Sequence, residues 1–236
     1  MQTIDCNLCG SDKSKEIFCA RDFTFASGER FRYVKCPECG LVFLSPRPSP
    51  DEIDKYYPDV YYQEYGEGPR ELEFLRSDYS EVIAGIRPPG RILDLGSQKG
   101  VFLKRMQDKG WEGFGVDISE KACRIAKTDY GLKNIYAGNI LDIDFPEDYF
   151  DVITLWHVVE HLHEPLHVMQ KLRRLLKPDG ILVAECPNIG SISAKLFGAR
   201  WQPLDAPRHL YQFSGRTLRD LMRRAGFMVN KVDYRS

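Results

Sequence analysis

The chain lacks a charge excess, a long apolar run and a leader pattern. Its 33 basic residues nearly balance 34 acidic ones, which leaves a formal net charge of -1. Without a global basic field, nucleic acid and anionic membranes are poor candidates as partners. No apolar run approaches the roughly 18 residues that a membrane span needs, and the N-terminal MQTIDC lacks the basic-then-apolar pattern of a signal peptide. We therefore expect a cytoplasmic protein without membrane insertion.

The 236 residues are 43% hydrophobic, which is enough for one full core and a small appendage. Seven of the residues are cysteines. Four of these cysteines form two Cys-x-x-Cys pairs, each followed by a glycine: Cys6 with Cys9, and Cys36 with Cys39. Because a two-residue spacer lets both sulfurs reach one ion, the four thiolates suit one tetrahedral, structural Zn²⁺.

The segment between the two cysteine pairs has the pattern of a hairpin that turns at Ser27 and Gly28, and LVFLSP after the second pair has the pattern of a further strand. A zinc ribbon over residues 1–45 is the resulting prediction. Redox-active dithiols or unrelated buried thiols are the alternatives, but a redox motif more often occurs singly at the start of a helix. We expect the remaining cysteines to be small core residues; they are Cys19, Cys123 and Cys186.

Residues 46–68 are rich in proline and tyrosine. The prolines of SPRPSP favour an extended linker, since each fixes its own φ and disfavours a helical conformation in the residue before it. The tyrosine-rich stretch from Tyr56 to Tyr65 carries more hydroxyls than a core strand would. It is predicted either to cover a ligand cleft or to pack the ribbon against the main domain.

Residues 91–119 have the pattern of a buried strand, a glycine turn, a helix and a second strand that ends in an acid. Gly96 and Gly100 allow the backbone to turn tightly, and the helix from about Val101 directs its free N–H groups at the turn. Asp117, at the tip of the second strand, is placed to accept hydrogen bonds from two ribose hydroxyls. The pattern predicts a nucleotide-binding βαβ unit.

The glycine spacing bears on which nucleotide is bound. A dinucleotide fingerprint needs glycine at its first, third and sixth positions, which here are Gly96, Gln98 and Val101. Two of the three positions lack glycine, so the chain does not match this fingerprint. The remaining pattern, acid-x-Gly-x-x-x-Gly, resembles motif I of the class I S-adenosylmethionine-dependent methyltransferases. A generic α/β turn with an incidental acid is the alternative.

The resemblance implies S-adenosylmethionine as the cofactor. It implies that Asp94 helps to bind the methionine ammonium group and that Asp117 holds the ribose. Gln98 stands where the family usually has a third glycine, so its side chain is expected to point away from the cofactor. The cofactor-binding residues implied in this way are Asp94, Gly96, Ser97, Gln98, Gly100, Asp117, Ile118, Asn139, Ile140 and Trp156. Of these, Asn139 replaces an acid that accepts from the adenine amino group, and the two isoleucines form the apolar walls.

FDVITLWHV at 150–158 predicts the fourth strand of the sheet, and Glu160 and His161 follow it. His157-x-x-Glu160-His161 matches the inverted zincin signature. That signature needs a continuous helix, whereas here His157 follows a strand and Pro165 suits the start of the next helix. WHVVEH instead resembles motif IV of small-molecule methyltransferases, which implies that Trp156, His157, Glu160 and His161 line the cleft above the transferred methyl.

The insert at 189–214 is too long for an ordinary strand-to-helix connection and is expected to lie over the substrate cleft. Its PRHLYQFS sequence resembles the tail of bacterial sugar and polysaccharide-biosynthesis methyltransferases, several of which carry a four-cysteine ribbon. The resemblance implies His209 as the general base. His157 is the second candidate, with Glu160 or His161 orienting its partner.

The predicted fold class is α/β: a doubly wound, mostly parallel Rossmann-like methyltransferase sheet over residues 69–236, with a small N-terminal zinc ribbon. The expected activity is methyl transfer to a small polar metabolite such as a sugar or nucleotide sugar. A zinc-ribbon binding protein with an inactive, cofactor-sensing domain is the alternative. MVNKVDY near the C-terminus is expected to be a sixth strand, and no sequence remains for a seventh. The exposed edge predicts shortening of the chain, loss of the strand or pairing in a homodimer.

Overall fold

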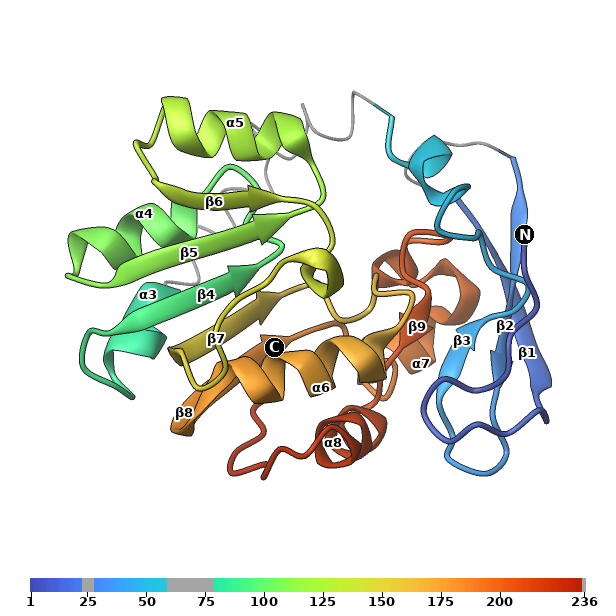
Figure 1. Cartoon of the computed structure of the whole chain (residues 1–236). Helices are drawn as coiled ribbons and strands as arrows, with labels where there is room; N and C mark the ends of the chain where they lie inside the picture. The colour runs from blue at the N-terminus through green and yellow to red at the C-terminus, as the bar shows by residue number, and fades with distance from the viewer. Residues whose placement is uncertain (23–27, 59–78, 235–236) are drawn as a thin grey trace. The chain divides into compact units, whose positions relative to one another are not determined.

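The computed structural model describes residues 1–22, 28–58 and 79–234 (Figure 1). Most of the tyrosine-rich stretch and the first part of the helix expected at 71–86 lie outside these residues. Contacts divide the described chain into two units. Unit 1 comprises residues 1–22, 28–58, 159–170 and 186–234, and unit 2 comprises residues 79–158 and 171–185.

Unit 2 contains a five-stranded sheet in which every neighbouring pair of strands is parallel, in the order β6-β5-β4-β7-β8 (Figure 1). The expected parallel sheet is therefore confirmed. Its apolar runs are buried on both faces, as parallel strands connected by helices require. The strands are β4 (Arg91–Leu95), β5 (Glu112–Asp117), β6 (Asn134–Ala137), β7 (Phe150–Trp156) and β8 (Leu176–Glu185).

Three helices of unit 2 share one hydrophobic cluster with the sheet: α3 (Tyr79–Ala84), α4 (Val101–Asp108) and α5 (Glu120–Thr128). The α5 helix begins where expected because the hydroxyl of Ser119 accepts a hydrogen bond from the Ala122 N–H. The helix α6 (Pro165–Leu175) begins at the proline, as predicted, and has residues in both units. It ends before the expected Lys177, because β8 already starts at Leu176.

Unit 1 contains a four-stranded antiparallel sheet in the order β1-β2-β3-β9. The bounds are β1 (Lys15–Arg21), β2 (Arg30–Lys35), β3 (Val42–Leu44) and β9 (Tyr211–Gln212). The pairing of β1 with β2 confirms the expected hairpin, although residues 23–27 of its turn lie outside the described ranges. The end of the long insert, β9, pairs with β3 through Val42 with Gln212 and Phe43 with Tyr211. No periodicity in the sequence indicated this pairing.

The remaining elements are short, except for α8 (Gly215–Arg224), which starts with a capping box formed by Ser214 and Thr217. The others are η1 (Ile53–Tyr56), η2 (Ile140–Asp142), α7 (Ile192–Phe197), η3 (Gly198–Arg200) and η4 (Gln202–Leu204). None of the helices in the described ranges is both long and apolar enough to span a membrane.

The sixth strand expected in MVNKVDY is wrong, because the described residues 227–234 form no strand. Met228 is 85% exposed and Tyr234 is 63% exposed. A strand gains its stability from a partner edge and from burial of one face. With these two side chains exposed, the segment gains little from either source.

Candidate functional site

The turn between β4 and α4 depends on Gly96. Its φ is 74°, and a Cβ at this position would lie 2.4 Å from Cγ2 of Val158. A side chain would therefore meet both an unfavourable backbone conformation and a steric clash. Two positions later, Gln98 also has a positive φ, of 48°, and its side chain is exposed. The backbone thus keeps the left-handed conformation typical of glycine although this position carries a side chain.

Asp117 holds this turn through its carboxylate. One oxygen, Oδ2, accepts a hydrogen bond of 2.8 Å from the Gln98 N–H, and Oδ1 accepts one of 2.8 Å from the Ser119 N–H. Burial raises the pKa of Asp117, while these backbone hydrogen bonds act in the opposite direction. Each carboxylate oxygen retains a second acceptor position, so Asp117 can still bind a pair of hydroxyls.

Asp94 lies in the middle of the sheet and is 3% exposed. The Thr154 hydroxyl on β7 donates a 2.7 Å hydrogen bond to Oδ1 of Asp94. Burial nevertheless raises the pKa of Asp94 to about 7. A bound cation such as an ammonium group would lower this pKa again and favour the carboxylate.

Two buried polar atoms in unit 2 lack a hydrogen-bond partner among the described residues: Oγ of Ser97 and Nε1 of Trp156. Buried polar groups normally have a partner, so such atoms are expected to bind a ligand or an ordered water. Ser97 belongs to the turn beside Gly96. Trp156 lies in the hydrophobic core, where its ring stacks on Tyr79 at a centroid distance of 4.0 Å.

The three residues expected around the adenine differ in exposure. Ile118 is 64% exposed and can contact a ligand, whereas Ile140 is only 2% exposed. Oδ1 of Asn139 accepts a 3.0 Å hydrogen bond from the Leu141 N–H and thereby caps η2. This oxygen keeps one acceptor position for an adenine amino group.

His157 follows β7 with a φ of 55°, and its side chain is 49% exposed. Nε2 of His157 lies 3.5 Å from Oε1 of Glu185 at the end of β8. The Tyr79 hydroxyl donates a 3.1 Å hydrogen bond to the same carboxylate oxygen. Tyr79 and Glu185 were not among the predicted site residues, because no sequence motif connects α3 with the end of β8.

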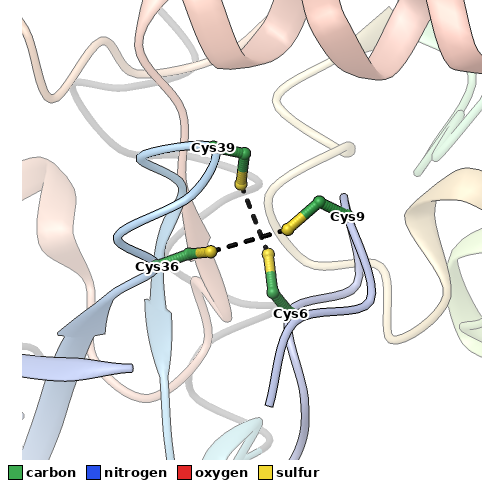
Figure 2. A group of neighbouring side chains, drawn as sticks. All are labelled: Cys6, Cys9, Cys36 and Cys39. Atoms are coloured by element: carbon green, nitrogen blue, oxygen red, sulfur yellow. Dashed lines mark hydrogen bonds between the residues drawn. The ribbon is translucent and has the colours of Figure 1, made fainter. Parts of the chain in front are cut away.

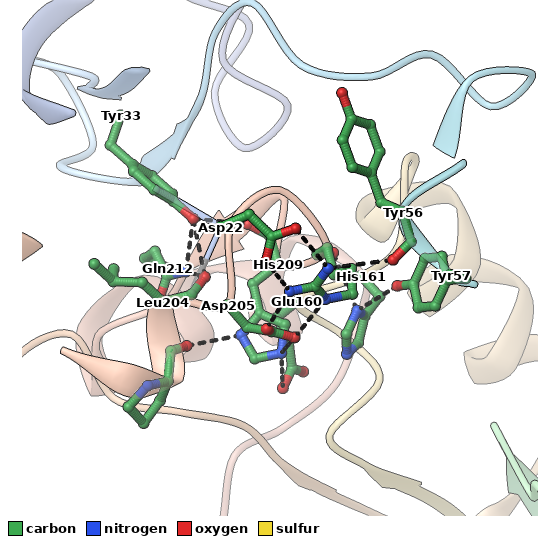
Figure 3. A network of polar contacts seen from close by, with 12 residues as sticks. Asp22, Tyr33, Tyr56, Tyr57, Glu160, His161, Leu204, Asp205, His209 and Gln212 are labelled. Carbon is green, nitrogen blue, oxygen red and sulfur yellow. Dashed lines mark hydrogen bonds and ion pairs between the residues drawn. The ribbon is translucent and has the colours of Figure 1, made fainter. Parts of the chain in front are cut away.

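Glu160 and His161 belong to unit 1 and lie in a turn, which confirms that the zincin-like pattern is not on a continuous helix. Their neighbour is His209 from the insert (Figure 3). Glu160, His161 and His209 each offer one potential ligand atom, and these atoms all lie within 4.8 Å of one another. Sequence reasoning selected all three residues as candidate catalytic groups, and the structure brings them together.

A buried arginine supports this part of the insert. The Arg208 guanidinium pairs with Asp22 at 2.9 Å and with Asp205 at 2.7 Å, and one of its N–H groups donates to the Tyr56 carbonyl at 3.2 Å (Figure 3). Arg208 thus connects the insert with the end of β1 and with η1. Neither aspartate stood out in the sequence as a partner for this arginine.

The four cysteines of the two Cys-x-x-Cys pairs converge in unit 1 (Figure 2). Sγ of Cys6 lies 3.4 Å from Sγ of Cys39, and Sγ of Cys9 lies 3.5 Å from Sγ of Cys36. In a tetrahedral site with Zn–S distances of about 2.3 Å, sulfur atoms lie about 3.8 Å apart, so these thiols fit such a site.

Equivalent turns position the two cysteine pairs. The Gly10 N–H donates to the Cys6 carbonyl at 2.7 Å, and the Gly40 N–H donates to the Cys36 carbonyl at 2.9 Å. Burial opposes ionisation of Cys36, but N–H groups of Cys39 and Glu38 together with neighbouring thiols lower its pKa to about 7. The thiolate, which is the ligand form, is therefore accessible near neutral pH.

The cysteines outside the cluster differ from one another. Cys123 is buried in the core of unit 2, as expected. Cys186 is half-buried, and Cys19 is exposed, so the prediction that Cys19 is a core residue is wrong. Its position on β1 places it on the outer face of the hairpin, which the alternation of the strand alone did not reveal.

Comparison with known proteins agrees with this geometry. The profile of a family described as a methyltransferase domain matches residues 62–232. The chain belongs to this family. A ubiquinone biosynthesis O-methyltransferase of Actinobacillus pleuropneumoniae is 27% identical over 154 residues, which are 60% of this chain and 65% of that protein. Another, from Nitrosomonas europaea, is 30% identical over 120 residues, which are 47% and 49% of the two chains.

The alignments thus span about half to two thirds of the length of these curated relatives. Among solved structures, an S-adenosylmethionine-dependent methyltransferase of Archaeoglobus fulgidus has a TM-score of 0.58 at 24% identity. The match covers 75% of this chain and 84% of that one. This likeness confirms the methyltransferase fold for the domain.

Proposed function

We propose that this methyltransferase-domain protein binds S-adenosylmethionine in unit 2 and transfers its methyl group to a hydroxyl of a small polar molecule. The turn after β4 is the main support for this proposal. Asp94 precedes Gly96 in the sequence, Asp117 follows it, and the Asp117 carboxylate accepts a hydrogen bond from the Gln98 N–H. A buried carboxylate for an ammonium group and a second for a ribose diol are what this cofactor needs.

The parts of this turn have separate roles in the proposal. Gly96 provides close backbone approach, and the unpartnered Oγ of Ser97 is a hydrogen-bond donor or acceptor for the ligand. No described side chain caps the N-terminus of α4, so its first N–H groups face the turn without a side-chain acceptor. The bound cofactor supplies an electrophilic methyl group, and the protein aligns the acceptor with it.

The names of the curated relatives support oxygen as the accepting atom, since both are ubiquinone biosynthesis O-methyltransferases. A sugar or nucleotide-sugar hydroxyl is the second candidate. The four-cysteine cluster and the PRHLYQFS segment favour it, because both resemble features of sugar-modifying methyltransferases. In either case the accepting hydroxyl group must lose a proton.

Removal of that proton is assigned to an imidazole, with His209 as the first candidate and His157 as the second. Nδ1 of His209 lies 2.8 Å from the Pro203 carbonyl oxygen, so Nδ1 carries the proton of the neutral ring and Nε2 has a lone pair. For His157, the carboxylate of Glu185 is the orienting partner. Glu160 and His161 lie near His209, so we assign them to the orientation of the His209 ring rather than that of His157.

We further propose that the cysteine cluster binds one structural Zn²⁺ through Cys6, Cys9, Cys36 and Cys39. The fit of the sulfur distances to a tetrahedral site supports this assignment.

Turnover tests the proposed activity. The purified chain is incubated with S-adenosylmethionine together with one acceptor at a time, drawn from small hydroxyl compounds and nucleotide sugars, and mass spectrometry follows S-adenosylhomocysteine and the methylated product. Acceptor-dependent formation of both is expected. Cofactor binding in calorimetry without turnover on any acceptor supports the sensor hypothesis instead, and the absence of binding contradicts the proposal.

A further inference from the structure

Besides the cysteines, unit 1 holds a second group of potential metal ligands, formed by Glu160, His161 and His209. One ligand atom from each lies within 4.8 Å of the other two. The imidazole rings of His161 and His209 are 4.5 Å apart between centroids and nearly perpendicular, at 85°. Figure 3 shows these rings and the Glu160 carboxylate gathered at one place.

His209 presents its Nε2 to this group. Because the Pro203 carbonyl can only accept, its 2.8 Å contact assigns the proton of the neutral ring to Nδ1. Nε2 then carries a lone pair and lies 3.9 Å from Oε1 of Glu160 and 3.9 Å from Oδ2 of Asp205. Two ligands of a tetrahedral ion at about 2.0–2.1 Å lie about 3.4 Å apart, so a small shift is sufficient.

His161 is held in the same manner. Its Nδ1 lies 3.1 Å from the Arg208 carbonyl oxygen and 3.0 Å from the Tyr57 hydroxyl. The carbonyl again assigns the proton to Nδ1 and the lone pair to Nε2. A hydrogen bond from the second ring nitrogen to a carbonyl is the usual arrangement of a metal-binding histidine, because it fixes the orientation of the ring.

The backbone fixes the two segments that carry these ligands. The Leu210 and Tyr211 N–H groups both donate to the Glu160 carbonyl, at 2.9 Å and 3.2 Å. The His209 N–H donates to the Asp205 carbonyl at 3.1 Å. Glu160 and His209 are therefore held next to each other although they are far apart in the sequence, and Glu160 is only 1% exposed.

The charges of the surrounding side chains also favour a cation. The positive Arg208 is paired with Asp22 and Asp205, whose side chains are 2% and 8% exposed. Together with Glu160, these four ionisable side chains carry three formal negative charges against one positive charge, and the imidazoles beside them add neutral donors. A divalent ion would compensate the excess, and burial makes such compensation important.

We propose that Glu160, His161 and His209 bind a divalent transition-metal ion through one carboxylate oxygen and two imidazole nitrogens. Two imidazoles and one carboxylate suit Zn²⁺, Co²⁺ or Fe²⁺, whereas Ca²⁺ and Mg²⁺ prefer sites made of oxygen atoms only. Three protein ligands leave at least one coordination position for water or for an oxygen of another molecule. His209, rather than His157 of the zincin-like pattern, completes the ligand set.

This site deepens the proposed function and rests on it in one respect: a hydroxyl acceptor coordinated to the ion would lose its proton more readily. With the ion bound, Nε2 of His209 is a ligand, and the ion takes over the role in proton removal that was assigned to the His209 imidazole. Metal binding itself does not depend on methyl transfer, so the two can be tested separately.

Co²⁺ titration tests the proposal in the full chain. Co²⁺ is added to protein that carries one equivalent of Zn²⁺ per chain, enough for the cysteine cluster alone, and calorimetry and visible absorption follow its binding. One further equivalent is expected to bind, with d–d bands but without sulfur-to-cobalt charge-transfer bands, because the ligands are nitrogen and oxygen. The substitutions Glu160→Gln and His209→Gln preserve side-chain size, and each is expected to weaken binding by at least about tenfold.

His167→Ala is the matched control, since this histidine is 70% exposed and lies outside the cluster. It should bind Co²⁺ as the parent does. Circular dichroism verifies that each variant is folded, and if one is not, the other and His161→Gln still test the site. A parent protein that binds no further equivalent, or folded Gln variants with parental affinity, would overturn the proposal. Metal binding without methyl transfer would instead contradict only the proposed function.

Discussion

Arg208 and Asp22 form an ion pair in the interior of unit 1, with a distance of 2.9 Å between Nη2 and Oδ1. The two residues are 186 positions apart in the sequence, and their side chains are 0% and 2% exposed. Arg208 belongs to the insert and Asp22 follows β1, so this pair joins the N-terminal segment of unit 1 to its C-terminal segment. The same guanidinium binds Asp205 next to the Glu160, His161 and His209 cluster.

Asp22→Ala is expected to destabilise unit 1, because it leaves the Arg208 guanidinium buried with one carboxylate fewer. Removal of one partner of a buried pair costs about 3–5 kcal/mol in the free energy of unfolding. Urea unfolding with fluorescence detection measures the change. Asp12→Ala, at an exposed position of the same unit, should change the free energy of unfolding very little. Equal stability of both variants would mean that solvent reaches the pair.

Cys36→Ser is expected to abolish binding of the proposed structural Zn²⁺, since three thiolates leave an incomplete tetrahedral site. Elemental analysis after gel filtration gives the stoichiometry. The control is Cys19→Ser, which changes an exposed cysteine of the same hairpin and should keep the ion. Zinc retained in full by Cys36→Ser, or absent from the parent, would contradict the assignment.

Asp117→Ala is expected to weaken S-adenosylmethionine binding by roughly 2–3 kcal/mol, on the scale of hydrogen bonds to a charged group. Because Asp117 also binds the Gln98 and Ser119 N–H groups, Asp117→Asn serves as a second variant that keeps an acceptor oxygen. Calorimetry gives the affinities. Asp108→Ala, at a side chain that is 61% exposed, should bind the cofactor normally. Unchanged affinity in folded Asp117→Ala would refute the ribose assignment.

Asp94 should make the cofactor-free protein less stable as the pH rises. Its pKa is about 7 in the folded state and 3.8 in the reference state, so the folded state binds more protons between these values. Stability is therefore lost across this window, by about 1.4 kcal/mol per pH unit at most. Thermal unfolding of the parent and of Asp94→Asn measures the difference, and the variant should show a flatter pH dependence.

The same carboxyl predicts the pH dependence of cofactor binding. An ammonium group binds the carboxylate, so affinity for S-adenosylmethionine should increase from about pH 5 to about pH 8 as Asp94 loses its proton. Calorimetry in buffers of different ionisation enthalpy would detect the released proton. Binding that is independent of pH in the parent would show that Asp94 does not contact the ammonium group.

Local sequence patterns were sufficient to predict much of the fold of this protein. The order of strand, glycine turn, helix and acid at 91–119 predicted β4, α4 and β5, because a buried parallel strand and an amphipathic helix each have their own periodicity. The Cys-x-x-Cys spacing predicted that four sulfurs would converge, since each pair is constrained by its own short turn. The sequence shows that Gln98 replaces the glycine that is usual at this position. It does not show that the Gln98 backbone keeps a positive φ.

Only the tertiary structure decided which distant residues meet. The pairing of β9 with β3, the burial of Arg208 between two aspartates and the meeting of Glu160 and His161 with His209 all join segments without a shared sequence pattern. Such contacts depend on how the chain returns in space, and a histidine in an insert has the same local sequence whether or not it meets another. Likewise, the apolar residues of MVNKVDY indicated a strand, but a strand also needs to bury one face, and Met228 and Tyr234 of this segment are exposed.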